Sequence, residues 1–252
     1  MLEKLSTIHP QHPIEEVIFA VFLHQTIARL DKFYQLQEKL HFNHLNYREG
    51  FINNQKISTG IEISQINQEG KIQKFLSISN ENQRGIIRFH ELAYTRWAEF
   101  KPLVLQILEY CNQIHKGLYV DAISLTYVDT FRWEDMNEPI PLAEIFNPDA
   151  LPKSLFYSKD IFTFSLHKIA RKNKEYNDQT DIDLREIYEP TPYTRLSVIH
   201  TVNLRISTED LGEILTNKLL DEELEFAHQT NKEKMKELFQ EKIRLEKMNL
   251  KV

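Results

Sequence analysis

Cysteine and glycine are scarce in this chain. Cys111 is the single cysteine among 252 residues, so an intramolecular disulfide and a zinc site made of several thiolates are excluded. It falls on the apolar side of a helical pattern, where we expect a buried, unreactive thiol. With only six glycines, the chain has neither the G-x-G-x-x-G nor the G-x-x-x-x-G-K-S/T phosphate loop. Nucleotide binding through those two loops is therefore excluded.

Long apolar runs are also lacking. The longest, Val17–Leu23, is far shorter than the roughly 20 residues that a membrane-spanning helix needs. The first dozen residues carry Glu3 and Lys4 and have no apolar centre, which does not match a secretory signal. We therefore expect a soluble, cytoplasmic protein without membrane contact.

A surplus of positive charge is missing as well. The chain has 31 basic and 37 acidic residues, a net charge of −6. This argues against broad binding to a phosphate backbone, although a local basic patch stays open. Hydrophobic residues make up 41% of the chain and charged residues 27%, an ordinary globular composition with enough apolar mass for a sizeable core.

The most informative stretch is an amphipathic helix followed by an aromatic strand. Apolar residues recur at helical spacing over Thr95–Lys116, Gly117 is a suitable end for this helix, and a strand rich in β-branched and aromatic residues extends to Trp133. Four side chains on the facing sides of this unit should be buried together: Trp97, Phe100, Leu108 and Tyr127.

The remaining elements follow from the same periodicities. We expect strands at Val17–Leu23, Leu155–Ile169, Ile182–Tyr188 and Tyr193–Ile206, an antiparallel meander over Phe51–His90, a helix over Gln25–His44, and a last helical region from Thr208 almost to Val252. Residues 134–152 contain four prolines and one short helical piece near Leu142–Phe146.

These elements predict an α+β fold, a mainly antiparallel sheet covered by helices with a long C-terminal helix. Its first half, residues 1–133, is compatible with a ferredoxin-like arrangement. Residues 134–154 form a connector, and residues 155–252 form a second half that packs with the first as one compact unit. The alternative is a helix-grip fold, which would have a cavity between the sheet and the last helix.

Catalytic and metal-binding motifs are weak. None of the ten histidines lies in a His-Glu-x-x-His context, and we expect no metal and no cofactor. Arg195 and His200 have the spacing of a helical ribonuclease class, but on a strand they would point to opposite faces. Two pairs of carboxylates, Asp181 with Asp183 and Asp121 with Asp129, are more typical of solvated turns and structural salt bridges. Asp129, inside the aromatic strand, needs a partner if it is buried.

The C-terminal segment suggests an interface. Residues 231–252 carry seven basic and four acidic side chains, a local charge of +3. A thin apolar stripe through Met235, Leu238 and Leu245 predicts that part of this helix contacts a partner, with Met235, Leu238, Arg244 and Lys247 as the contacting residues. A second copy, giving a homodimer, is the simplest partner. An acidic protein is an alternative, and nucleic acid is one that the net charge does not favour.

Three blocks of sequence carry a resemblance to known proteins. They are His12-Pro-Ile-Glu-Glu-Val17; Tyr94-x-x-Trp-x-x-Phe100 with Tyr110 and Ile123-Ser-Leu-Thr-Tyr-Val-Asp129; and Leu220-Asp221 with His228 and Phe239. In these blocks the chain resembles a sporadically distributed, uncharacterised family of bacterial and archaeal proteins of similar length. It departs from the family's pattern where Thr126 replaces an arginine and Asp129 an asparagine.

Two classes of function follow as expectations. The scattered distribution of the family implies a component of a bacterial antiviral-defence or toxin–antitoxin system. The acidic charge and the lack of catalytic motifs favour a non-catalytic binding or regulatory protein. The alternative is an enzyme or sensor acting on a nucleotide or nucleic acid, with Asp129 and His228 as the candidate catalytic residues and the basic segment 232–251 as support.

Overall fold

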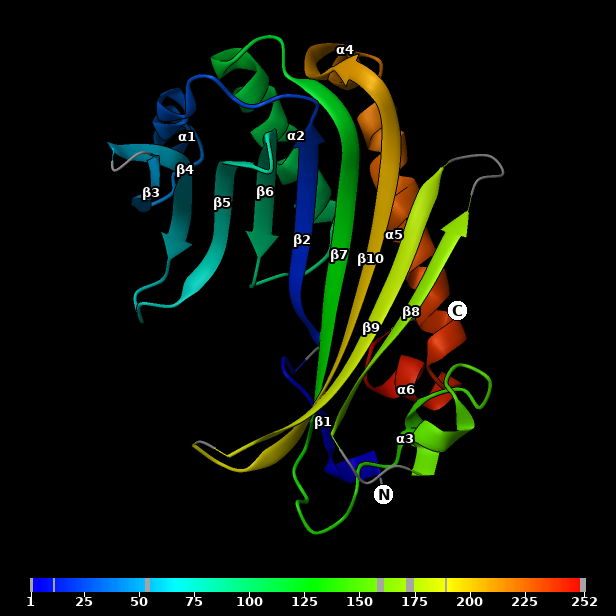
Figure 1. Ribbon diagram of the computed structural model, residues 1–252. Coiled ribbons are helices and arrows are strands. Elements are labelled where there is room, and N and C mark those ends of the chain that lie inside the picture. The colour runs from blue at the N-terminus through cyan, green and yellow to red at the C-terminus, as the bar shows by residue number, and fades with distance from the viewer. Residues whose placement is uncertain are drawn as a thin grey trace.

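One antiparallel sheet runs through the whole protein. The computed structural model describes residues 2–10, 12–52, 55–157, 161–170, 175–188 and 190–249. Its ten strands follow the order β3-β4-β5-β6-β2-β7-β10-β9-β8, with β1 paired to β7 off this path (Figure 1). The strands are β1 (Leu5–Thr7), β2 (Ile14–Leu23), β3 (His44–Ile52), β4 (Gln55–Ile66), β5 (Ile72–Glu81), β6 (Arg84–Glu91), β7 (Tyr119–Trp133), β8 (Phe162–Ala170), β9 (Tyr176–Ile187) and β10 (Tyr193–Asp210).

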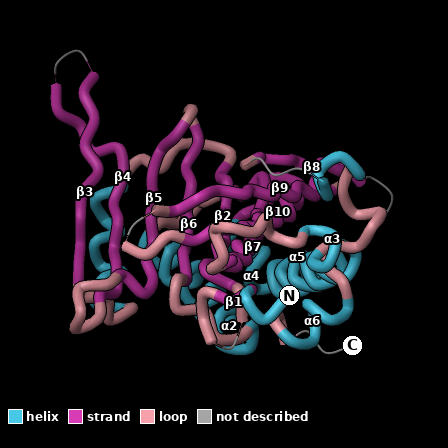
Figure 2. Tube along the Cα trace, turned by 90° about the horizontal axis from the view of Figure 1, so that it is seen from below, coloured by secondary structure: helices cyan, strands magenta, loops and turns pink. Residues whose placement is uncertain are grey.

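The helices lie on one side of this sheet, and the other side is open (Figure 2). They are α1 (Leu36–Lys39), α2 (Trp97–Ile114), α3 (Leu142–Ile145), α4 (Leu211–Thr216), α5 (Leu219–Leu238) and α6 (Glu241–Glu246), with 3₁₀ turns at Leu2–Lys4, Leu30–Gln35 and Lys153–Tyr157. The α+β class is thus confirmed, and the antiparallel meander expected over Phe51–His90 is present as β4–β6, with β3 added at its edge. The sheet also joins the two halves of the chain, because β7 of the first half pairs with β10 of the second along most of its length.

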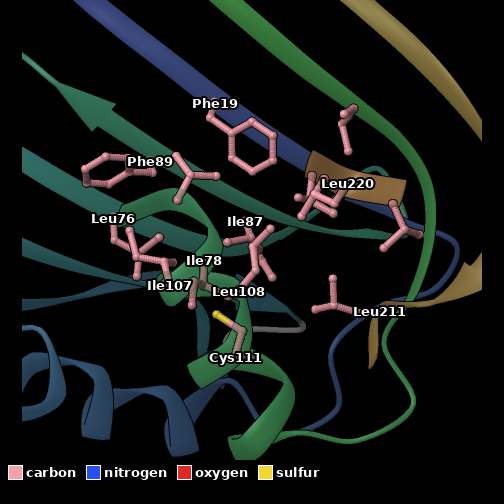
Figure 3. Close-up of a cluster of buried hydrophobic side chains, with 14 of the residues drawn as sticks. Phe19, Leu76, Ile78, Ile87, Phe89, Ile107, Leu108, Cys111, Leu211 and Leu220 are labelled. Carbon is pink, nitrogen blue, oxygen red and sulfur yellow. The ribbon is translucent and has the colours of Figure 1, made fainter. Parts of the chain in front are cut away.

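The first apolar cluster packs α2 against the sheet. Apolar residues of α2 recur at helical spacing and face β2 and the meander; the buried ones are Phe100, Val104, Ile107, Leu108 and Cys111. Figure 3 shows Ile107, Leu108 and Cys111 of α2 in one cluster with Phe19 of β2 and Leu76 of β5. Burial raises the pKa of the Cys111 thiol, so the expected unreactive thiol is confirmed. Gly117, with φ of +75°, follows the helix in the left-handed conformation that favours glycine.

The second apolar cluster lies at the other end of the sheet. It joins β1 and the last residues of β7 to α3, α6 and the end of α5. Phe239 is central to it, because its ring stacks on that of Phe146 at 5.1 Å and approaches that of Phe131 at 5.6 Å.

Two helical predictions need correction. The helix expected over Gln25–His44 is only the 3₁₀ turn and the four-residue α1, and β3 already begins at His44. The apolar period is real, because Leu30, Phe33 and Leu36 are buried, but a short turn suffices to bury them. The last helical region is three helices rather than one. It breaks at Lys218, with φ of +58°, and at Phe239, whose extended backbone lets the ring enter the second cluster.

The ferredoxin-like comparison for the first half is not confirmed. That half contributes seven strands to the shared sheet, four of which form the meander β3–β6 between α1 and α2. The meander adds one side of a wide sheet, so the first half has no separate sheet of its own.

Removing the side chain of Leu108 tests the first cluster. Leu108 is 1% exposed, and we expect Leu108→Ala to lower the free energy of unfolding by about 2–5 kcal/mol because it leaves a cavity between α2 and the sheet. The matched control is Leu245→Ala on α6, where the leucine is 48% exposed and the expected loss is below about 0.5 kcal/mol. Urea unfolding of both variants makes the comparison, and equal midpoints would contradict the packing described here.

Candidate functional site

A cluster of aromatic and titratable side chains lies between β7, α2 and α5. The hydroxyl of Tyr127 is 2.7 Å from Nδ1 of His228. The ring of Trp97 stacks on that of His228, with centroids 4.2 Å apart and planes 11° from parallel. Tyr94 meets Tyr127 edge-on, and His12 lies beyond Tyr94 at 6.0 Å between ring centroids. Side chains from three distant parts of the sequence, His12, the Tyr94–Tyr127 region and His228, therefore meet in this cluster.

The outer edge of this cluster is tied to α5 by polar contacts. The indole N–H of Trp97 donates to Glu225 at 2.9 Å, and Lys101 reaches Glu225 at 3.3 Å and Asp221 at 3.0 Å. Burial acts to raise the pKa of Glu225, but hydrogen bonds from Trp97, Gln229 and Lys101 together lower it to about 2. These contacts join α2 to the first two turns of α5.

Asp129 lies one pleat further along β7 on the same face as Tyr127. It is 3% exposed, and burial raises the pKa of its carboxyl from 3.8 to about 7. Among the described residues no cation forms an ion pair with it, so the salt bridge that we expected is not found. Its neighbour Arg132 does not supply one, because alternation along the strand places Arg132 on the open face.

A second polar group continues from Tyr127 across the sheet. His200 of β10 lies directly opposite Tyr127, and its Nε2 is 2.7 Å from a carboxylate oxygen of Asp178. The side-chain amide nitrogen of Asn231 on α5 is 2.9 Å from the other ring nitrogen. Burial acts to raise the pKa of Asp178, but the hydrogen bond and charge of His200, together with the charges of Lys234 and Lys168, outweigh it, and the net shift is downward. We call the whole set the polar belt: Tyr94, Tyr127, Asp129, Asp178, His200, His228 and Asn231.

The polar belt lies between the two apolar clusters and is closed. Each of its seven side chains is at most 7% exposed. Burial lowers the pKa of His228 to about 4 and raises that of Tyr94 to about 12, so both are neutral near pH 7. A general acid or base must come within hydrogen-bond reach of its substrate, and an exposure of at most 7% leaves these side chains little contact with solvent. As it stands, this arrangement holds α2 and α5 in place.

Of the other candidates, Asp181 and Asp183 share a face of β9 within the strand rather than in a turn, and two further pairs are separated. Arg195 and His200 lie on opposite faces of β10, as predicted, because Arg195 pairs with Glu15 on the open face while His200 is buried under α5. Asp121 contacts His24 and Thr208 at the rim of an open groove of about 1140 Å³, eight residues along β7 from Asp129, or roughly 26 Å. The described residues contain no group of three or more side chains that could hold a metal ion.

The predicted partner residues of the last helix lie mostly inside the fold. Met235 is 2% and Leu238 1% exposed, and both belong to the second apolar cluster. The stripe looked too thin in sequence because His228 and Asn231 share the buried face of α5 with its apolar residues. Of the predicted set only Arg244 and Lys247, both half-buried, stay near the surface.

The open face carries a feature that sequence reasoning missed. Three arginines lie directly opposite one another on adjacent strands: Arg132 of β7, Arg195 of β10 and Arg185 of β9. We call them the arginine row. The side chains of Arg185 and Arg195 are 68% and 32% exposed, and the exposed Arg132 lies over the ring of Tyr193 at 4.9 Å. No motif or periodicity in the sequence predicts the arginine row, because the row depends on the register of three strands.

Two carboxylates partly neutralise the arginine row. Arg195 is paired with Glu15 at 2.5 Å and donates to Ser197 at 3.0 Å, and Arg185 is paired with Asp183 at 2.6 Å. Within the described part of the chain, Arg132 has no ion-pair partner. Three guanidinium groups against two carboxylates leave one positive charge on a chain of −6.

Comparisons of the chain with protein-family models, with curated proteins and with solved structures find no match. Over the described ranges, no helix is both long and apolar enough to cross a membrane. The function proposed below therefore rests on the chemistry of the polar belt and of the arginine row.

Because the pKa of Asp129 is raised in the folded state, the free energy of unfolding decreases as pH rises. Between about pH 4 and pH 7 the folded state keeps the proton that the unfolded state has lost, so stability falls as pH rises through this window. Asp129→Asn removes the effect. We expect it to stabilise the protein relative to the unsubstituted chain by roughly 4 kcal/mol at pH 8 and by much less at pH 4. Urea unfolding at both values measures the difference, and a difference that does not change with pH would show that Asp129 is not buried as described.

Proposed function

We propose that this chain is a non-catalytic binding protein that contacts an acidic protein partner through the open face of its sheet, at the arginine row. The proposal rests on the difference between the helix-covered face and the open face of the sheet. The side chains best suited to acid–base chemistry are closed within the polar belt, whereas Arg132 and Arg185 are exposed and Arg195 is partly exposed on a face that no helix of the described residues covers.

The arrangement of the arginine row supports an anionic partner. Like charges directly opposite each other on adjacent strands are destabilising. Opposite residues of antiparallel strands are only about 4.5–5.5 Å apart at Cα, so the positive charges of the three side chains repel one another. An anion that bridges Arg132 and its neighbours would remove this repulsion, and the guanidinium fork suits two-pronged binding of carboxylates.

A protein is a better partner for this face than nucleic acid. A polyanion meets the field of the whole chain, which is −6, before it reaches the row. A protein partner presents a few local carboxylates and can complement the polar and apolar groups around the row as well. The family resemblance supports a cytoplasmic defence or toxin–antitoxin setting, in which the partner is another protein of the same system.

Neutralising the exposed arginines tests the binding face. Two probes report on it: a polyglutamate peptide and a single-stranded oligonucleotide of equal charge. For the chain with Arg132→Ala and Arg185→Ala, we expect the affinity for the peptide to fall about tenfold or more, because each charge-assisted hydrogen bond contributes roughly 1.5–3 kcal/mol before non-additivity. The matched control is Arg29→Ala, an arginine that is 61% exposed and paired with Asp31 away from the row. Titration calorimetry at one salt concentration compares all three chains.

The alternatives are separated by the same titrations. Oligonucleotide binding that is tighter than peptide binding and is lost in the double variant would assign the row to nucleic acid instead. Equal loss in the Arg29→Ala control would show that only the overall charge matters and would contradict a defined site.

A separate change tests the absence of catalysis. We expect a chain with Asp129→Asn and His228→Gln to retain its biological effect, because both side chains are buried within the polar belt, away from the open face of the proposed contact. Circular dichroism establishes that the variant is folded. Loss of the effect in a folded variant that still binds the peptide would favour the enzyme class.

A further inference from the structure

The two edges of the sheet differ in how they are protected. At the edge formed by β3, the pairing with β4 is interrupted by a register shift between Arg48 and Glu49, and two charged residues stand side by side there. Bulges and charges of this kind are devices by which proteins prevent edge-to-edge pairing. The edge at β3 therefore resists the addition of a further strand.

The edge formed by β8 has no register shift, and Lys168 is its single Lys, Arg, Asp or Glu. All nine residues of β8 pair with β9 without a register shift, and no proline interrupts the strand. Ile161 directly precedes the strand and is 62% exposed, and Ile169 lies near its other end and is 59% exposed. Both are among the large apolar side chains exposed on the described part of the protein. In the strand order β8 comes last, so its outer backbone groups face away from the sheet. A regular edge of about 30 Å is a template for another strand.

A groove runs beside this edge on the helix side. Its volume is about 660 Å³, and its lining combines Leu166 of β8, Lys234 and Leu238 of α5 and the loop residues Asn147 and Ala150. Side chains of an added strand alternate between the two faces, so every second one would point to this side. The groove thus offers contact with Leu166 and with charged side chains such as Lys234 and Glu237, in addition to backbone hydrogen bonds.

We propose that β8 pairs antiparallel with β8 of a second copy of this chain. A two-fold axis through Leu166 overlaps all nine residues and places Phe164 opposite Lys168 and Thr163 opposite Ile169. Lys168 is the only Lys, Arg, Asp or Glu on the strand, and this register sets its ammonium beside an aromatic ring, so no like charges meet. The strand is therefore complementary to itself, and two-fold pairing closes the edge in both copies at once.

The self-pairing makes a definite prediction about disulfide cross-linking. In antiparallel strands, opposite Cα atoms are about 4.5–5.5 Å apart, which lies within the range of a disulfide. A chain with Thr163→Cys mixed with a chain carrying Ile169→Cys should form a covalent dimer under mild oxidation. Thr163→Cys alone should not, because the two copies of residue 163 would lie roughly 20 Å apart. Cys111 does not interfere, since it is fully buried.

Mass measurements on the full-length chain complete the experiment. We expect light scattering over a dilution series to show a dimer, and Ile169→Lys to raise its dissociation constant about tenfold, because a two-fold dimer contains the change twice. The matched control is Asn46→Lys, an exposed position on the opposite edge strand β3, which should leave the dimer unchanged.

Each outcome decides the proposal. A monomer at every concentration overturns it, and so does a dimer that survives Ile169→Lys and shows no cross-link between positions 163 and 169. If Ile169→Lys does not fold by circular dichroism, the cross-linking result alone decides, because both cysteine positions are exposed and need no change in the core.

Discussion

The hydrogen bond between Tyr127 and His228 is the constraint on which the arrangement of the two long helices depends. It joins the middle of β7 to the middle of α5, and the stack of Trp97 on His228 adds α2 to the same point. If α5 were held by an apolar stripe alone, it could shift along the sheet by one turn at little cost in free energy. A buried hydroxyl and a buried imidazole tolerate no such shift, because each would lose its partner in a medium of low dielectric. The second link, from Asn231 through His200 to Asp178, repeats this argument one turn later.

The polar belt also explains how one wide sheet carries two apolar clusters. Each cluster is closed at its outer end by helices and at its inner end by the belt, so neither forms an independent core. Alternation along β7 and β10 then places hydroxyls and arginines on the opposite face, above the same positions that hold the belt. The closed face determines the position of the helices, and the open face remains available for contact with other molecules.

Local patterns in the sequence predicted the parts of this structure that depend on near neighbours. The helix over Thr95–Lys116, the strand to Trp133 and the meander are periodic over many residues, and all are present. The helix over Gln25–His44 failed because three buried residues at helical spacing are also satisfied by a 3₁₀ turn, with a four-residue α-helix after it. The arginine row, the link between Tyr127 and His228, and the free edge at β8 depend on which strands become neighbours. Pairings across 60 or more residues, such as Arg195 with Arg132 and Tyr127 with His228, leave no periodic trace in one sequence.

The two proposed surfaces are linked by geometry. Antiparallel pairing at β8 has its two-fold axis perpendicular to the sheet, so the open faces of both copies would lie on the same side. The two arginine rows would then be fixed on one continuous surface, one on each side of the shared edge, each beginning on β9, the strand next to β8. A partner with two acidic segments could bind both rows, and the second contact would be intramolecular, which raises the effective affinity without any new kind of interaction. Self-association would in this way strengthen a site whose single net charge makes it weak in one copy.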